Sequence, residues 1–106
     1  MRRQSILKLT PESKIYVLCP SQVATGGPEA IHQLVHELRV LGYDASIVYS
    51  PQVDEPTPAA YRHYGINNVW EIDDKPLNLL IVPEVWADRV KEFSNMQKAI
   101  WWLSVD

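Results

Sequence analysis

Three apolar runs, each followed closely by a proline, restrict most strongly how this chain can fold. Neither the first nor the third run alternates regularly between apolar and polar residues, which is typical of strands covered on both faces. The runs comprise residues 15–19, 45–49 and 77–82, and they precede Pro20, Pro51 and Pro83. The chain is therefore expected to form a sheet whose strands lie between layers of helices.

A helix is predicted between the first two runs. Pro28 suits its first turn, because the missing N–H of proline would have no partner there. An apolar stripe with helical spacing follows, and Gly42 then suits a left-handed cap. The stripe comprises Ile31, Leu34, Val35, Leu38 and Leu41. Strand, helix and strand in this succession predict a βαβ unit with a right-handed crossover.

The middle of the chain is less regular. Its prolines and acidic residues favour a loop, and its next glycine, Gly65, favours the end of a short helix. The predicted elements are a loop over residues 52–58, a short helix over residues 59–64 and a short edge strand over residues 69–72.

A second helix and a last strand are predicted after the third apolar run. The helix covers residues 85–93, and the strand covers residues 99–105 with Trp101 and Trp102 on opposite faces. The inner face of the helix comprises Val85, Trp86, Val90 and Phe93. Strands that alternate with helices predict an α/β fold, namely a Rossmann-like three-layer domain with an open parallel sheet of about four strands.

Length, charge and cysteine content narrow the class of protein. A chain of 106 residues has room for one domain, here residues 14–106 after a flexible leader over residues 1–13. The net charge of -3, with no dense stripe of basic residues, gives no reason to expect nucleic acid as a partner. No apolar stretch approaches the length of a membrane span. The single cysteine, Cys19, predicts a cytoplasmic location, because it has no partner for an internal disulfide.

Gly26 and Gly27 stand where the first strand gives way to the first helix. Neither has a Cβ, so a phosphate or a sugar could approach the main chain and the opening N–H groups of the helix. In open parallel sheets, ligands bind at the carboxyl ends of the strands, where this loop emerges. The pair belongs to neither a G-x-G-x-x-G fingerprint nor a Walker loop, and a simple tight turn explains it equally well.

A resemblance to a known family is carried by the stretch KIYVLCPSQVATGGPEAIHQLVHELRVLGYDASIVY, which covers residues 14–49. This stretch resembles the opening of bacterial glycosyltransferases of the GT-B architecture, especially family-4-like enzymes of polysaccharide biosynthesis. The resemblance continues weakly through residues 60–65 and resumes at NLLIVPE and at WWLSVD. It implies the acceptor-side half of an enzyme that moves a sugar from a nucleotide-sugar to an acceptor hydroxyl. It further implies that Gly26, Gly27, Glu84 and Asp106 line the cleft near the donor phosphates or the transferred sugar.

The chain contains nothing that resembles the second half of a GT-B enzyme. That half would supply the donor-binding acidic residues and the basic phosphate clamp. The chain alone is therefore expected to be an inactive fragment, completed by a missing C-terminal domain or by a partner chain. No cofactor and no metal are expected. A non-catalytic binding domain completed by a partner chain is a further interpretation.

Cys19 suggests a different function, because it stands at the end of the first strand. Phosphocysteine carriers of sugar phosphotransferase systems, of the IIB type, are α/β domains of similar size. Such a carrier needs backbone donors around the thiolate, whereas Pro20 removes one of them. The loop that follows also lacks a basic residue that would lower the pKa of the thiol. A buried, unreactive cysteine is the favoured interpretation.

Three further groups of residues could bind ligands, and each has a structural explanation that we prefer. The histidines of the first helix are predicted to lie on its exposed face, and the aromatic residues to anchor a short helix to the core. The acidic group is predicted to belong to a loop that precedes a strand. The groups are Glu29, His32 and His36; Tyr61, Tyr64 and Trp70; and Glu71, Asp73 and Asp74.

Overall fold

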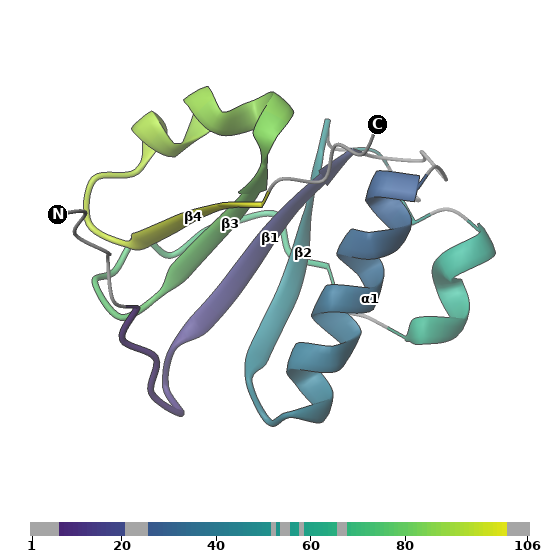
Figure 1. Ribbon diagram of the computed structural model, residues 1–106, viewed down its shortest axis with the longest axis horizontal. Coiled ribbons are helices and arrows are strands. Elements are labelled where there is room, and N and C mark those ends of the chain that lie inside the picture. The colour runs from purple at the N-terminus through teal and green to yellow at the C-terminus, as the bar shows by residue number, and fades with distance from the viewer. Residues whose placement is uncertain are drawn as a thin grey trace, which may run out of the picture.

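The computed structural model describes residues 7–20, 26–51, 53, 56–57, 59–65 and 68–101. Within these ranges, four strands form a parallel sheet in the order β2-β1-β3-β4 (Figure 1). The strands are β1 (Lys14–Pro20), β2 (Asp44–Ser50), β3 (Leu79–Pro83) and β4 (Gln97–Trp101). The predicted α/β fold, a Rossmann-like three-layer domain with an open parallel sheet, is confirmed.

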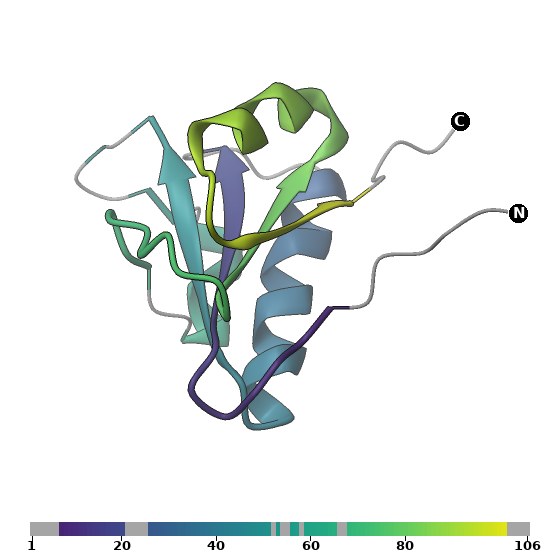
Figure 2. The same ribbon diagram turned by 90° about the vertical axis from the view of Figure 1, so that its left-hand side faces the viewer.

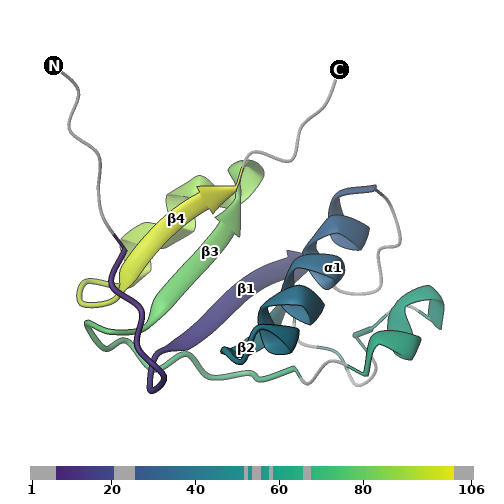
Figure 3. The same ribbon diagram turned by 60° about the horizontal axis from the view of Figure 1, so that its bottom comes forward.

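Helical segments cover both faces of this sheet. The α-helix α1 (Gly26–Val40) packs on one face, and the 3-10 helix η2 (Glu84–Glu92) packs on the other. A second 3-10 helix, η1 (Ala59–Tyr64), lies beside α1 (Figure 3). Figure 2 shows α1 on one side of the strands and the segment that precedes β3 on the other.

Alternate residues of each strand enter two separate cores, because neighbouring side chains of a strand point to opposite faces. On the α1 side, the buried residues are Ile15, Val17, Cys19, Ile31, Val35, Ala45, Ile47, Tyr49 and Leu79. On the η2 side, they are Tyr16, Leu18, Val48, Leu80, Val82 and Met96. The unbroken apolar run of β1 thus arises from burial on both faces, as predicted. β2 is also buried on both faces, although its run contains the polar Ser46.

The C-terminus of α1 has the geometry of a Schellman motif. The N–H of Tyr43 donates to the carbonyl of Leu38, and the N–H of Gly42 donates to the carbonyl of Arg39, both at 3.0 Å. Gly42 has a φ of 98°, which confirms the predicted left-handed cap. The predicted apolar stripe ends one turn early, because Leu41 lies beyond the helix and is exposed.

The helix predicted over residues 85–93 forms as η2, but not with α-helical geometry. Its backbone is a 3-10 helix with a kink at Trp86, and Val85 is 77% exposed, so Val85 does not belong to the inner face. The predicted contacts of Trp86, Val90 and Phe93 with the core are confirmed. A 3-10 helix has three residues per turn, so the kink and the tighter winding rotate Val85 away from the sheet.

Two predicted strands have different bounds or do not form. The segment around residues 69–72 makes a single bridge, in which the N–H of Val69 donates to the carbonyl of Ile47 at 2.9 Å. Its apolar side chains, Val69 and Ile72, pack on the η2-side core without strand pairing. β3 begins at Leu79, because the backbone N–H of Asn78 donates to the carbonyl of Lys75 in the preceding turn at 2.9 Å. The side chain of Asn78 accepts the N–H of Lys14 at 2.9 Å.

Several predictions fall partly outside the described residues. The described part of β4 ends at Trp101, whereas Trp102 lies outside it. The predicted leader is described from Leu7 onward, where the backbone of Lys8 exchanges two hydrogen bonds with the Gln97 side chain. Leu9 packs against the α1-side core, so this part of the leader contacts the sheet.

Candidate functional site

The carboxyl ends of the four parallel strands lie along one edge of the sheet (Figure 1). From β1 the chain passes through α1 to β2, and it then returns past β1 to reach β3. The connections of β1 and β3 therefore diverge at this edge, which is the position where open α/β sheets bind ligands.

Three of the four predicted site residues lie at this edge. Gly26 and Gly27 open α1 after β1, and Glu84 opens η2 directly after β3. Asp106, the fourth, lies outside the described residues. The start of α1 presents N–H groups that have no partner within the helix, and Glu84 adds a carboxylate. The edge thus combines backbone donors with an acceptor.

A buried chain of hydrogen bonds lies behind the start of α1. The side chain of His32, which is 0% exposed, reaches two elements at once. Its Nδ1 lies 2.7 Å from the carbonyl oxygen of Pro28, and its Nε2 lies 2.7 Å from the hydroxyl of Tyr49 on β2. The Tyr49 hydroxyl in turn lies 2.8 Å from the hydroxyl of Thr57. These hydrogen bonds connect α1, β2 and the segment after β2.

The protonation of His32 follows from its partners. The Pro28 carbonyl only accepts, so Nδ1 must carry the proton that it donates. Burial lowers the pKa of His32 below 6.5, although the bond to Pro28 opposes this shift. In the neutral ring, Nε2 therefore accepts from the Tyr49 hydroxyl, and Tyr49 can accept from Thr57. Burial also raises the pKa of Tyr49 to about 12, so its hydroxyl stays protonated.

The prediction of an exposed histidine face on α1 is wrong for His32. The sequence pattern groups it with Glu29 and His36, of which Glu29 is exposed and His36 is half-buried. His32 lies one turn after Pro28 and one turn before the buried Val35, at the flank of the apolar stripe. This spacing is the sequence signal that could have indicated a buried His32. Its partner Tyr49 on β2 cannot be identified from the local sequence.

Cys19 is buried in the α1-side core, as the favoured interpretation predicted. Its exposed fraction is 0%, and burial raises the pKa of the thiol to about 12. The Sγ atom lies 3.5 Å from the carbonyl oxygen of Pro20, which can accept its proton but cannot stabilise a thiolate. This environment is the reverse of the one that activates a nucleophilic cysteine.

Tyr61 and Tyr64 anchor η1 to α1. The ring of Tyr61 lies 4.6 Å from that of His32, and the ring of Tyr64 lies 5.4 Å from that of His36, measured between centroids. Tyr61 is buried, so it is not available to a ligand. Trp70 differs, because its side chain is partly exposed on the opposite face of the sheet. The predicted anchoring role is therefore confirmed for the two tyrosines only.

Asp74, from the predicted acidic group, has a structural role. Its carboxylate accepts the N–H groups of Ser94, Asn95 and Met96 at 3.1, 3.1 and 2.8 Å. Burial raises the pKa of Asp74, but these hydrogen bonds outweigh it and leave the pKa below its ordinary value. Asp74 thus ties the segment before β3 to the turn before β4. Among the described residues, no group of acidic, histidine or cysteine side chains is arranged to hold a metal.

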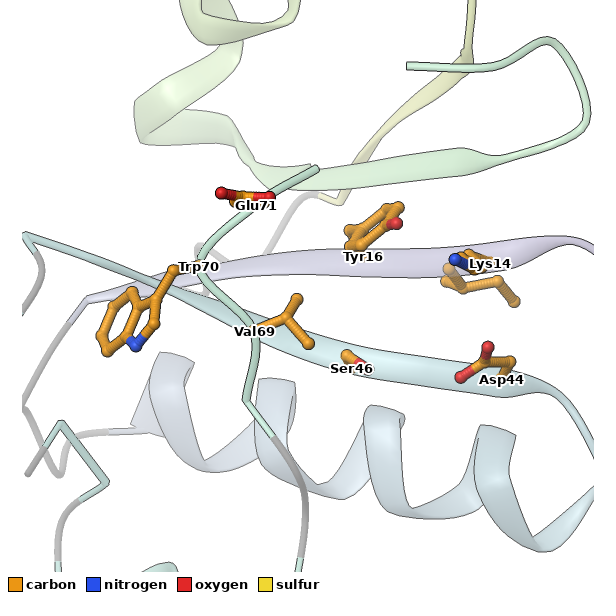
Figure 4. Close-up of a pocket in the computed structure, with 8 residues that line it drawn as sticks. Lys14, Tyr16, Asp44, Ser46, Val69, Trp70 and Glu71 are labelled. Carbon is orange, nitrogen blue, oxygen red and sulfur yellow. The ribbon is translucent and has the colours of Figure 1, made fainter. Parts of the chain in front are cut away.

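A hollow of about 550 Å³ lies on the η2 side of β1 and β2, away from the carboxyl edge (Figure 4). Lys14 and Asp44 lie at its end near the start of the strands, and Trp70 extends toward the carboxyl ends. The segment around Val69 crosses over the strands between them. This hollow does not include any of the predicted site residues.

No protein-family model, no curated protein and no solved structure matches this chain. In the part of the chain that the structure describes, no helix has the length and apolar character needed to cross a membrane.

Proposed function

We propose that this chain is the acceptor-side half of a glycosyltransferase of the GT-B architecture. The complete enzyme would move a sugar from a nucleotide-sugar donor to an acceptor hydroxyl, and this half would be inactive alone. The observation that supports the proposal best is the position of Gly26, Gly27 and Glu84 at one edge of a parallel sheet. The resemblance of residues 14–49 to such enzymes supplies the reaction class.

The proposed roles follow from the charges at this edge. The leaving nucleoside diphosphate gains negative charge during transfer, and the N–H groups at the start of α1, which have no partner within the helix, would stabilise it. The missing Cβ atoms of Gly26 and Gly27 would let a phosphate or a sugar hydroxyl come close to these groups. Glu84 would repel a phosphate, so its carboxylate would instead accept hydrogen bonds from the hydroxyl groups of the sugar.

A titration of the ¹⁵N-labelled chain with a nucleoside-diphosphate sugar tests the proposal. Saturable shifts are expected for the backbone amides of Gly26, Gly27, Glu29 and Ala30 and of residues 84–86, without any sugar transfer by the chain alone. Gly27→Val should remove these shifts with little effect on the fold, since the new side chain blocks close approach. Leu41→Val, an exposed substitution at the far end of α1, serves as the control.

The titration also has an outcome that rejects the proposal. If the nucleotide-sugar shifts no amide at this edge, or if Gly27→Val and wild type respond alike, the edge does not bind the donor. Capture of a partner chain together with such a negative result would favour the non-catalytic binding domain. In a complete enzyme, Gly27→Val should reduce turnover, and equal turnover would remove the support for these residues.

A further inference from the structure

A second, smaller hollow of about 220 Å³ lies on the η2 side of the sheet, between the ends of β1 and β2, the segment around Trp70 and η2. We refer to it as the Arg89 hollow. It is lined by Leu18, Val48, Tyr49, Ser50, Trp70, Ile72, Arg89 and Phe93. Arg89 is the one charged residue among these eight, so the hollow favours a ligand with negative charge.

The guanidinium of Arg89 is held in place by three contacts. Its Nη1 donates to the hydroxyl of Ser50 at 3.0 Å, and its Nε donates to the carboxylate of Glu92 at 3.4 Å. Its Cζ lies 5.4 Å from the centre of the Trp86 ring. These bonds use Nε and Nη1, which leaves the two N–H groups of Nη2 for a ligand. A guanidinium that is already oriented loses little freedom when it binds.

Glu92 does not cancel the preference for an anion. Its side chain is 54% exposed and the contact with Arg89 is long, so the pair is a solvent-screened surface ion pair that contributes little. Arg89 can also form two parallel hydrogen bonds with a carboxylate or a phosphate, which a single contact at 3.4 Å to Glu92 does not achieve.

Trp70 supplies an apolar surface beside this charge. The residue is 37% exposed. An exposed aromatic ring binds the apolar face of a sugar, while the hydroxyl groups remain free to form hydrogen bonds. The volume lies below the roughly 300–1,000 Å³ of pockets for drug-sized ligands, so it suits a single ring. Trp70 also borders the larger hollow of Figure 4, where a longer ligand would continue.

We propose that the Arg89 hollow binds one sugar ring that carries a carboxylate or a phosphate. The anionic group is bound by Nη2 of Arg89, and the ring lies against Trp70. This binding follows from the hollow alone. The interpretation of the bound ring as part of the acceptor rests on the proposed function.

The test compares four probes on the ¹⁵N-labelled chain: glucuronate, glucose 1-phosphate, glucose and inorganic phosphate. We expect the two anionic sugars to shift the indole N–H of Trp70, which Trp70→Phe identifies, and to bind about tenfold more tightly than glucose. Inorganic phosphate should also bind more weakly, because it has no ring to contact Trp70. The two anionic sugars together distinguish a carboxylate from a phosphate as the preferred group.

Arg89→Gln should weaken binding of the preferred probe by about tenfold or more. Lys14→Gln is the matched control, since it removes the same charge from the neighbouring hollow, and it should bind like wild type. Arg89→Lys keeps the charge but loses the planar guanidinium that forms two parallel hydrogen bonds, so it should bind more weakly than wild type. It also serves as the test if the melting curve of Arg89→Gln shows a loss of folding.

Three results would overturn the proposal. They are equal affinity for glucose and glucuronate, equal losses in Arg89→Gln and Lys14→Gln, and shifts confined to residues outside the hollow. The nucleotide-sugar titration at Gly26 and Glu84 is read from different amides. A failure there with success here would reject the proposed donor site and leave the Arg89 hollow in place.

Discussion

Tyr49→Phe is expected to lower the free energy of unfolding by about 2 kcal/mol, because it removes the central hydroxyl of a buried hydrogen-bond chain. That hydroxyl lies 2.7 Å from Nε2 of His32 and 2.8 Å from the hydroxyl of Thr57. Phenylalanine keeps the ring and opens no large cavity. The substitution therefore measures the polar contacts rather than the packing.

The magnitude follows from the burial of His32. With Tyr49 gone as a donor, Nε2 has no partner at a position that is 0% exposed, and leaving a buried acceptor unpaired costs about 1–3 kcal/mol. The hydroxyl of Thr57 is only half-buried, so water can replace the bond that it loses. The expected cost therefore lies near the middle of that range and arises mainly at His32.

Urea unfolding followed by circular dichroism measures this cost, with Tyr16→Phe as the matched control. The Tyr16 hydroxyl accepts the N–H of Asp73 at 3.2 Å, and Asp73 is partly exposed, so the control should lose clearly less stability. His32→Leu combined with Tyr49→Phe should cost less than the sum of the single changes. The reasoning is refuted if Tyr49→Phe costs no more stability than Tyr16→Phe. It is also refuted if the costs of His32→Leu and Tyr49→Phe are simply additive in the double variant.

Three further changes test other parts of the fold. Because burial lowers the pKa of His32, the unfolded state binds a proton at this residue more readily than the folded state does, so stability should fall as the pH drops below 6.5. Urea titrations at several pH values should show this fall in wild type and in the control His63→Gln, which changes an exposed histidine, but not in His32→Leu. Gly42→Ala should lower stability by about 1 kcal/mol in thermal melts, through backbone strain at φ 98° with no clash. Asp74→Asn should destabilise the chain at neutral pH and match wild type well below pH 3.8, where protonation weakens the same bonds to residues 94–96.

The elements that could be predicted from sequence are those whose cause is local. The run that forms β1 is apolar on both faces, and Gly42 adopts the conformation that only glycine adopts without strain. These properties depend on a few neighbouring residues. The pairing of β1 with β2 also follows from the predicted βαβ unit, whereas the pairing of β1 with β3 does not.

The features that sequence analysis missed depend on residues far apart in the chain. His32 is buried because Tyr49, 17 residues later, provides a partner for Nε2. Asp74 accepts N–H groups that lie 20 to 22 residues later, so nothing in its local sequence distinguishes it from other acidic loop residues. The Arg89 hollow likewise joins η2 to Ser50 on β2, 39 residues away. None of these pairs follows a helical or strand repeat.

The buried hydrogen bonds of His32 also affect the candidate site, because His32 contacts the first turn of α1 from the protein interior. Nδ1 donates to the Pro28 carbonyl, next to Gly27, while Nε2 is fixed by Tyr49 on β2. A ligand at the start of α1 would meet a turn that is held by the sheet, so little ordering would be needed on binding. If this support matters, Tyr49→Phe should weaken a ligand at Gly27 beyond what the fraction of unfolded chain explains. Unchanged affinity in the folded fraction would instead mean that His32 stabilises the fold without orienting the site.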